Sequence, residues 1–250
     1  RQVVQHPDGG VVGEILVADG DMVEAGQVLI RFDATLQRSR LAVLEGQINE
    51  ILARRARLEA ERDGLDALNL PPELADRADE PAIARLIAGQ ASLFQARATS
   101  LAGERAQLAE RITQIENQIA GASAQRVALQ TQLDLLQPEL RDQQDLLSRG
   151  LTQAATVSAL QREAARLAGS IGEIDASIAE SRGRIAEIEL DSLRLGSRFR
   201  EEAITTLRDL DYSEIELRES RLSLLETLSR LDLRAPRAGI VYGLTVYAIR

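Results

Sequence analysis

Histidine and cysteine, the residues that most often bind transition metals, are almost absent from this sequence. His6 is the only histidine among the 250 residues, and there is no cysteine. Disulfides, thiolate metal sites and cysteine nucleophiles are therefore excluded. One histidine without a neighbouring ligand rarely binds metal, so we expect His6 to begin a strand. The acidic segment 73–80 lacks the alternating ligands and central glycine of a calcium loop, and we interpret it as a solvated connector. With no nucleophile–base pair, phosphate loop or metal cluster, we expect no enzyme activity and no cofactor.

The amino-acid composition also limits which partners and which fold class are possible. All 30 basic residues are arginine, the formal net charge is −9, and no basic block stands out, which argues against a nucleic-acid partner. Aromatic residues make up only 2%, whereas helix-forming Ala, Leu, Glu, Arg and Gln abound. Long helices fit this composition better than a spherical core. No apolar run reaches 18 residues, and because Arg1 is not an initiator methionine we interpret the chain as a fragment.

One short β-type pattern occurs near both ends of the chain. The stretch "HPDGGVVGEILV" (6–17) aligns with "APRAGIVYGLTV" (235–246), with Pro7 over Pro236 and Gly10 over Gly239. Residues 3–33 are dense in Val and Ile and punctuated by turn sequences that include Gly20 and Gly26. We expect 1–33 and 233–250 to be two halves of one β module, the second half truncated at the end of the chain.

The residues between these halves have helical periodicity. Helices are expected at about 35–68, with Asp33 or Thr35 as cap, and at 82–147 and 153–231, within a helical domain spanning 34–232. Residues 69–81 contain three prolines and form a polar loop. Pro138 should kink the second helix or begin a new helical segment. That helix carries an a/d heptad repeat of apolar residues. The positions are Leu108, Ile112, Ile115, Ile119, Ala122, Leu129, Leu133, Leu136, Leu140 and Leu147.

A short turn joins the two longest helices. Gly150 is a plausible stop for the first and Thr152 a plausible N-cap for the second, so the tip lies at about 148–152. Helices joined by so few residues must be antiparallel neighbours, each ~100 Å long or more. Because the two outgoing helices laid end to end would be about 20 residues longer than the return helix, we expect them to overlap, with three helices side by side near the β module and two near the tip. Arg126 interrupts the apolar seam, and it either fixes the register or extends to solvent.

The two half-modules resemble the biotinyl/lipoyl-carrier fold. The pattern Val17-x-x-Gly20-x-x-Val23-x-x-Gly26-x-x-Leu29 matches its first half, and Pro236-x-x-Gly239-Ile240-Val241 matches its second. No lysine is present, so the amide-linked biotin or lipoate of a carrier cannot form. A split lipoyl-like β-sandwich with an inserted α-helical hairpin resembles the membrane-fusion proteins, or periplasmic adaptors. The extra outgoing helix is similar to the hemolysin-D-like branch of type I secretion systems.

This resemblance implies a periplasmic bridge in a Gram-negative cell, anchored in the inner membrane by a segment outside this chain. Such adaptors assemble as a ring, here expected as a hexamer, between an ABC exporter and a TolC-type outer-membrane channel, and pass a secreted protein. Family tips carry an Arg–Leu–Ser/Thr set, which corresponds here to Arg141, Leu146 or Leu147, and Thr152. Gly150 and Leu151 complete the expected tip contact. An adaptor of a drug-efflux pump and a purely structural coiled-coil protein remain as alternatives.

Overall fold

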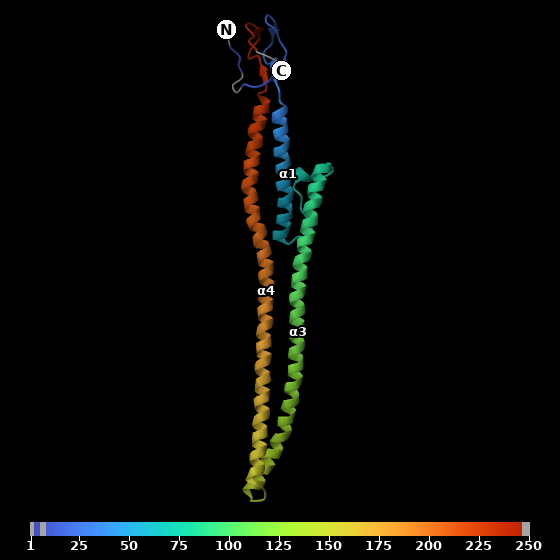
Figure 1. The fold of residues 1–250 in the computed structure, drawn as a ribbon, viewed down its shortest axis with the longest axis vertical. Helices are drawn as coiled ribbons and strands as arrows, with labels where there is room; N and C mark the ends of the chain where they lie inside the picture. Colours follow the sequence, from blue (N-terminus) through green and yellow to red (C-terminus); the bar gives the residue numbers. More distant parts are fainter. Residues whose placement is uncertain (1–2, 6–8, 247–250) are drawn as a thin grey trace. The chain divides into compact units, whose positions relative to one another are not determined.

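The computed structural model describes residues 3–5 and 9–246. In chain order, short strands β1 (Val12–Ile15), β2 (Met22–Val23) and β3 (Val28–Phe32) precede the helices. Helices α1 (Thr35–Asp63), α2 (Pro72–Ala75), α3 (Pro81–Ser148) and α4 (Ala154–Ser229) follow, and strands β4 (Asp232–Arg234) and β5 (Gly239–Ile240) come last (Figure 1). The expected class, mainly α with a hairpin inserted into a small β module, is confirmed. Two compact units are present, one formed by the residues up to Phe94 together with those from Arg200 onward, the other by Gln95–Phe199.

Strands from both ends of the chain pair with each other in the first unit. The three-stranded sheet has the order β1-β3-β4, and β2 pairs with β5, all antiparallel. Ile30 lies opposite Leu233, and Val23 opposite Gly239. The Nε of Arg31 also donates to a carboxylate oxygen of Asp232 at 3.0 Å, which raises the pKa of Arg31. The two half-modules predicted from the repeated pattern therefore form one β module.

The glycines of the lipoyl-like pattern join the two halves. The N–H of Gly20 donates to the carbonyl of Val241, and the N–H of Gly26 to that of Ala235. Gly26 has φ of +82°, which favours glycine at this turn. At Gly10, a Cβ atom would lie 2.9 Å from the Phe32 ring, so the close approach requires the missing side chain. Pro236 follows the buried Ala235 in a bend between β4 and β5. The predicted residues His6 and Pro7 lie outside the described residues.

Three helices run together in the first unit, as the helix lengths predicted. The α1 residues Ile48, Leu52 and Ala53 pack with Leu74 and Ile83. A second cluster joins Leu58 of α1 to residues of α4. Those α4 residues are Ala203, Leu207 and Leu210. The N-cap of α1 is Ala34, which forms no side-chain cap bond, so the prediction of Asp33 or Thr35 as cap was wrong. Just before the helix, the Asp33 carboxylate accepts hydrogen bonds from the hydroxyl and N–H of Thr35, which lower the pKa of Asp33.

In the second unit, α3 and α4 form an antiparallel pair. Every predicted α3 seam residue, from Leu108 to Leu147, is half-buried rather than fully buried. Fully buried apolar side chains in this unit lie on α4, at Val157, Leu167, Ile171 and Ile178. Two helices can cover each other only along one stripe, so the seam stays partly open to solvent.

Helix boundaries differ from the predictions in two places. Helix α1 ends at Asp63 rather than near 68, because Gly64 adopts φ of +68° and the N–H groups of Gly64 and Leu65 both bond the Ala60 carbonyl. Helix α3 is continuous through Pro138, so Pro138 does not begin a new segment. A kink at Pro138, the other alternative, stays a prediction, because a proline inside a helix removes one backbone donor and its ring crowds the preceding turn. Across 3–5 and 9–246, none of the helices combines the length and apolarity that crossing a bilayer demands.

Candidate functional site

The turn between α3 and α4 is the predicted site, and its backbone ends α3 sharply. Gly150 has φ of +76°, its N–H donates to the carbonyl of Leu147 at 3.0 Å, and the N–H of Leu151 donates to that of Leu146 at 2.9 Å. This pair of bonds is the Schellman arrangement, which satisfies carbonyls at a helix end. Gly150 therefore acts as the helix stop that the sequence indicated, and the turn holds its side chains on a rigid support.

Apolar side chains at the turn differ in exposure. Leu151 is 70% exposed, whereas Leu146 and Leu147 are half-buried. Leu147 is a seam residue of the helix pair, so its side chain serves packing as well as any contact at the tip. Leu151 is thus the larger free apolar surface of the predicted set.

Thr152 does not cap α4. The helix begins at Ala154, so the flanking residue is Gln153, whose carbonyl accepts a hydrogen bond from the N–H of Thr156 at 3.0 Å. Thr152 lies one position too early and is half-buried in the turn. The N-cap prediction was therefore wrong.

Arg141 presents a cation near the turn. Its Nε donates to the Gln137 carbonyl of its own helix at 3.4 Å, and within the described chain its guanidinium forms no ion pair. In contrast, Arg149 is bound to Asp145 at 2.7 Å. A free guanidinium fork can bind a carboxylate or a pair of helix-end carbonyls. Arg141 therefore has the chemistry of a docking residue, whereas the charge of Arg149 is already compensated.

A cross-helix ion pair joins α3 and α4 in the second unit. The Nε of Arg126 on α3 lies 2.5 Å from a carboxylate oxygen of Asp175 on α4, with both side chains almost half exposed. Arg126 therefore contacts the neighbouring helix, and a role in fixing the register stays a prediction. An exposed pair contributes little stability, and its predicted value here is to favour one alignment of the helices.

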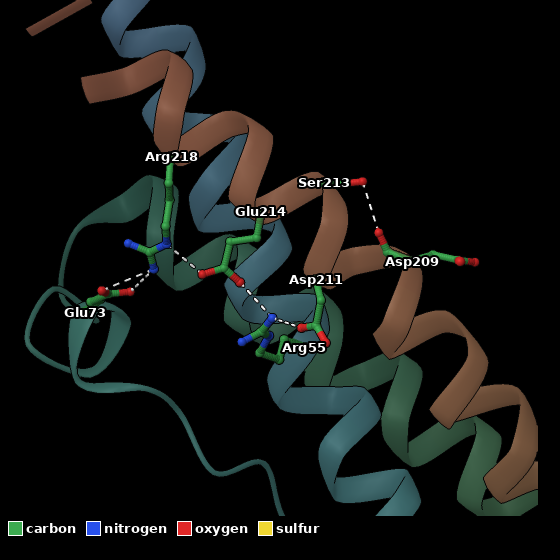
Figure 2. A network of polar contacts seen from close by, with 7 residues as sticks. All are labelled: Arg55, Glu73, Asp209, Asp211, Ser213, Glu214 and Arg218. Atoms are coloured by element: carbon green, nitrogen blue, oxygen red, sulfur yellow. Dashed lines mark hydrogen bonds and ion pairs between the residues drawn. The ribbon is translucent and has the colours of Figure 1, made fainter. Parts of the chain in front are cut away.

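A polar network in the first unit was not predicted (Figure 2). Glu214 of α4, whose side chain is 10% exposed, lies between Arg55 of α1 at 2.9 Å and Arg218 at 2.7 Å. Arg55 also pairs with Asp211, and Arg218 binds Glu73 of α2 at 2.9 Å. The hydrogen bonds from Arg218 to Glu73 and to Glu214 raise the pKa of Arg218, and the bond to Glu73 has the larger effect. The network joins α1, α2 and α4, and sequence spacing alone could not pair residues 145 positions apart.

The connector after α1 is more ordered than expected. Leu74, in the short helix α2, is 0% exposed and packs on α1 and the start of α3. Glu80 accepts two hydrogen bonds from the guanidinium of Arg77 at 2.8 Å, which lower the pKa of Glu80. The acidic residues Glu73, Asp76, Asp79 and Glu80 are exposed, as a solvated connector requires, whereas the buried Leu74 and the short helix α2 were not predicted. Residues 3–5 and 9–246 contain no cluster of three His, Cys, Asp or Glu side chains placed to hold a metal ion.

Comparison with known proteins gives consistent matches. Residues 37–226 match the family model described as AprE, long alpha-helical hairpin. The chain is 39% identical over 246 residues to the type I secretion system membrane fusion protein PrsE of Rhizobium meliloti (strain 1021), covering 98% of this chain. It is 33% identical over 254 residues to the alkaline protease secretion protein AprE of Pseudomonas aeruginosa, covering 99%. These alignments span 56% and 57% of the two relatives, so the chain corresponds to a little over half of their length.

A solved structure is also similar. The soluble domain of LipC, a membrane fusion protein of a type I secretion system, superposes with a TM-score of 0.91 at 28% identity. The match covers 99% of this chain and 93% of that chain. The likeness therefore includes both the β module and the helices.

Proposed function

Because the chain belongs to the AprE family of long α-helical hairpins, we propose that it is the periplasmic part of a type I secretion adaptor. In this role it bridges an inner-membrane ABC exporter and a TolC-type outer-membrane channel during protein export. The observation that carries the proposal is 39% identity across 98% of the chain to a type I secretion membrane fusion protein. Like its relatives, the protein acts as an adaptor rather than an enzyme, and the energy for export comes from the ABC partner.

The proposed mechanism depends on the contacts that the protein makes and not on a chemical reaction. The β module joins the two ends of the described chain, since strands from both ends pair there, and the turn between α3 and α4 belongs to the other compact unit. Leu151 offers an apolar contact and Arg141 a free guanidinium, which suit the apolar and carboxylate or carbonyl groups of a helical channel end. Each such contact is small, and a ring of six copies gains affinity by presenting six of them at once.

Secretion by a strain that lacks its own adaptor tests the proposal, with the complete protein supplied from a plasmid. Leu151→Asp should lower export of the secreted protein at least about tenfold, because it places a charge where an apolar contact forms. Leu135→Asp is the matched control, since Leu135 is 72% exposed on the same unit but lies within α3.

Arg141→Ala gives a second, independent change at the tip. It should reduce export while leaving helicity and thermal unfolding unchanged, because the side chain makes only one long bond to its own helix. Arg149→Ala is its control, since the ion pair with Asp145 already occupies that guanidinium. Normal export by both Leu151→Asp and Arg141→Ala would exclude docking through this turn.

A further inference from the structure

The apolar seam between α3 and α4 cannot by itself select one alignment of the two helices. Its residues recur at intervals of seven on both helices, as Leu108 and Ile115 do on α3 and Leu167 and Ile174 do on α4. Sliding one helix past the other by seven residues therefore brings apolar side chains onto apolar side chains again. Contacts other than those of the seam must distinguish the observed alignment from one that is displaced by a heptad.

Arginine replaces an apolar residue at two seam positions of α3. Arg105 and Arg126 occupy the same heptad position as Ile112 and are 21 residues apart, which is three heptads. Both side chains reach α4 within the second unit. The Nε of Arg126 lies 2.5 Å from a carboxylate oxygen of Asp175, and the guanidinium of Arg105 lies against Gly196. The two α4 residues are themselves 21 residues apart.

Gly196 leaves the space that the Arg105 guanidinium occupies. A Cβ atom built on Gly196 would collide with Nη2 of Arg105 and would lie 3.6 Å from its Cζ. Gly196 is buried, whereas Gly169, Gly172 and Gly183 of the same helix are exposed, and within the described chain a Cβ on any of these three would meet open space. Because glycine inside a helix is unfavourable relative to alanine, we attribute Gly196 to the close approach of Arg105.

The two arginine contacts specify the same alignment. In a pair of antiparallel helices the numbers of facing residues have a constant sum, and both arginine pairs give 301. Half of this sum falls between Gly150 and Leu151, which is where the turn lies. Two contacts three heptads apart and the turn at the end of the helices therefore agree on one register.

A slide of one heptad breaks this agreement. In one direction Arg126 would face Arg182, and two like charges would meet. In the other direction Arg126 would face Ala168 and lose its carboxylate partner. Arg105 would then gain a carboxylate at Glu189, but that side chain would fill the space that a glycine leaves open. Each displaced alignment thus lacks a contact that the observed one has.

We propose that Arg105 and Arg126 are positioning residues that hold α3 and α4 in one alignment, with Gly196 as the notch for Arg105. An exposed ion pair adds little stability, and a polar residue in an apolar seam lowers stability while it specifies the register. The contacts therefore serve alignment more than strength. The inference goes beyond the proposed function and does not depend on it. Its consequence is that the same residues always form the turn, since a slide of one heptad moves the midpoint of the hairpin by about half a heptad.

Pulsed electron paramagnetic resonance measures the alignment directly. The chain contains no cysteine, so Asn117→Cys on α3 and Gln161→Cys on α4, both at exposed positions of the second unit, can carry one nitroxide label each. The two positions lie far apart along the helix pair, and a slide of one heptad changes their separation by about 10 Å. Each protein is measured with the native turn and with Gly150→Ala, which weakens the preference of the turn for its place.

With both arginines present, we expect a single distance for either turn. Arg105→Leu combined with Arg126→Leu should leave the urea midpoint unchanged or raise it, because the apolar seam becomes continuous. In the Gly150→Ala chain the same double change should add a second distance about 10 Å from the first. Arg111→Leu is the control, since Arg111 is an exposed residue of α3 outside the seam, and it should keep one distance.

Two results would overturn the inference. One is a single distance in the Gly150→Ala chain that lacks both arginines, because the seam would then specify the alignment alone. The other is a second distance in the Gly150→Ala chain that retains both arginines, because the turn would then set the alignment and the arginines would not. Neither measurement involves an exporter or a channel, so the proposed function stands or falls separately in the secretion assay.

The notch has a test of its own that does not require sliding. Gly183→Ala should raise the urea midpoint, because alanine favours the helix and the added methyl group meets open space. Gly196→Ala should not raise it, because the methyl group displaces the Arg105 guanidinium. An equal rise for both variants would show that Arg105 needs no notch at Gly196.

Discussion

Leu74→Ala tests whether the connector between α1 and α3 is anchored to the helices. The Leu74 side chain is 0% exposed and contacts a cluster built from Ile48, Leu52 and Ala53 of α1 and Ile83 of α3. Truncation removes buried methyl groups and leaves a cavity between two helices that cannot close over it. A fully buried Leu→Ala change costs about 3 kcal/mol, which we expect in the unfolding free energy of the first unit.

Urea unfolding followed by circular dichroism measures this loss of stability. The rate of trypsin cleavage measures local opening of the connector. Arg77 lies three residues beyond the anchor, so release of Leu74 should speed cleavage after Arg77. Leu65→Ala is the control because Leu65 is 44% exposed, and its cost should stay below about 1 kcal/mol. A loss under about 1 kcal/mol for Leu74→Ala, with unchanged cleavage after Arg77, would show that the anchor contributes nothing.

Three further outcomes follow from the contacts. Glu214→Gln should lower the unfolding free energy by about 2 kcal/mol in urea titrations, because the nearly buried Glu214 carboxylate that pairs with both Arg55 and Arg218 is lost. Gly150→Ala should lower it by about 1 kcal/mol, since φ of +76° is strained for any other residue, whereas an unchanged midpoint would contradict the turn geometry. Thr35→Ala should raise the pKa of Asp33 measured by NMR titration. The substitution removes the hydrogen bond from the Thr35 hydroxyl, which lowers this pKa most, and leaves only the bond from the backbone N–H. The depressed pKa of Asp33 adds stability that is present above its unfolded value and is lost as the pH falls through the folded pKa.

Periodic features were predictable because they depend on local sequence. The heptad positions from Leu108 to Leu147 identified the half-buried stripe of α3, and Gly150 identified the end of this helix. The repeated pattern near both termini indicated that 1–33 and 233–250 form one β module, and the pairing of β3 with β4 and of β2 with β5 confirms this, although the repeated stretches themselves do not pair with each other. Errors of a few residues arose where two signals competed, as at Gly64, which stopped α1 before the apolar pattern ended.

The connector and the polar network required the tertiary structure. Leu74 stands among prolines and acidic residues, so its local sequence indicates solvent, and only packing on Ile48 and Ile83 makes it part of the core. Glu214 looks like an ordinary surface residue of a helix until Arg55 and Arg218 are brought to it.

The sequence by itself therefore determined the helices, their turn and the strands at both ends, since periodicity, capping and glycine positions act within a few residues of the chain. Only the tertiary structure decided which polar side chains meet and which apolar ones remain uncovered, such as Ile215 and Leu151. The physical reason is that exposure and ion pairing depend on neighbours from distant parts of the chain, whereas helix and strand formation depend mainly on the residues nearby.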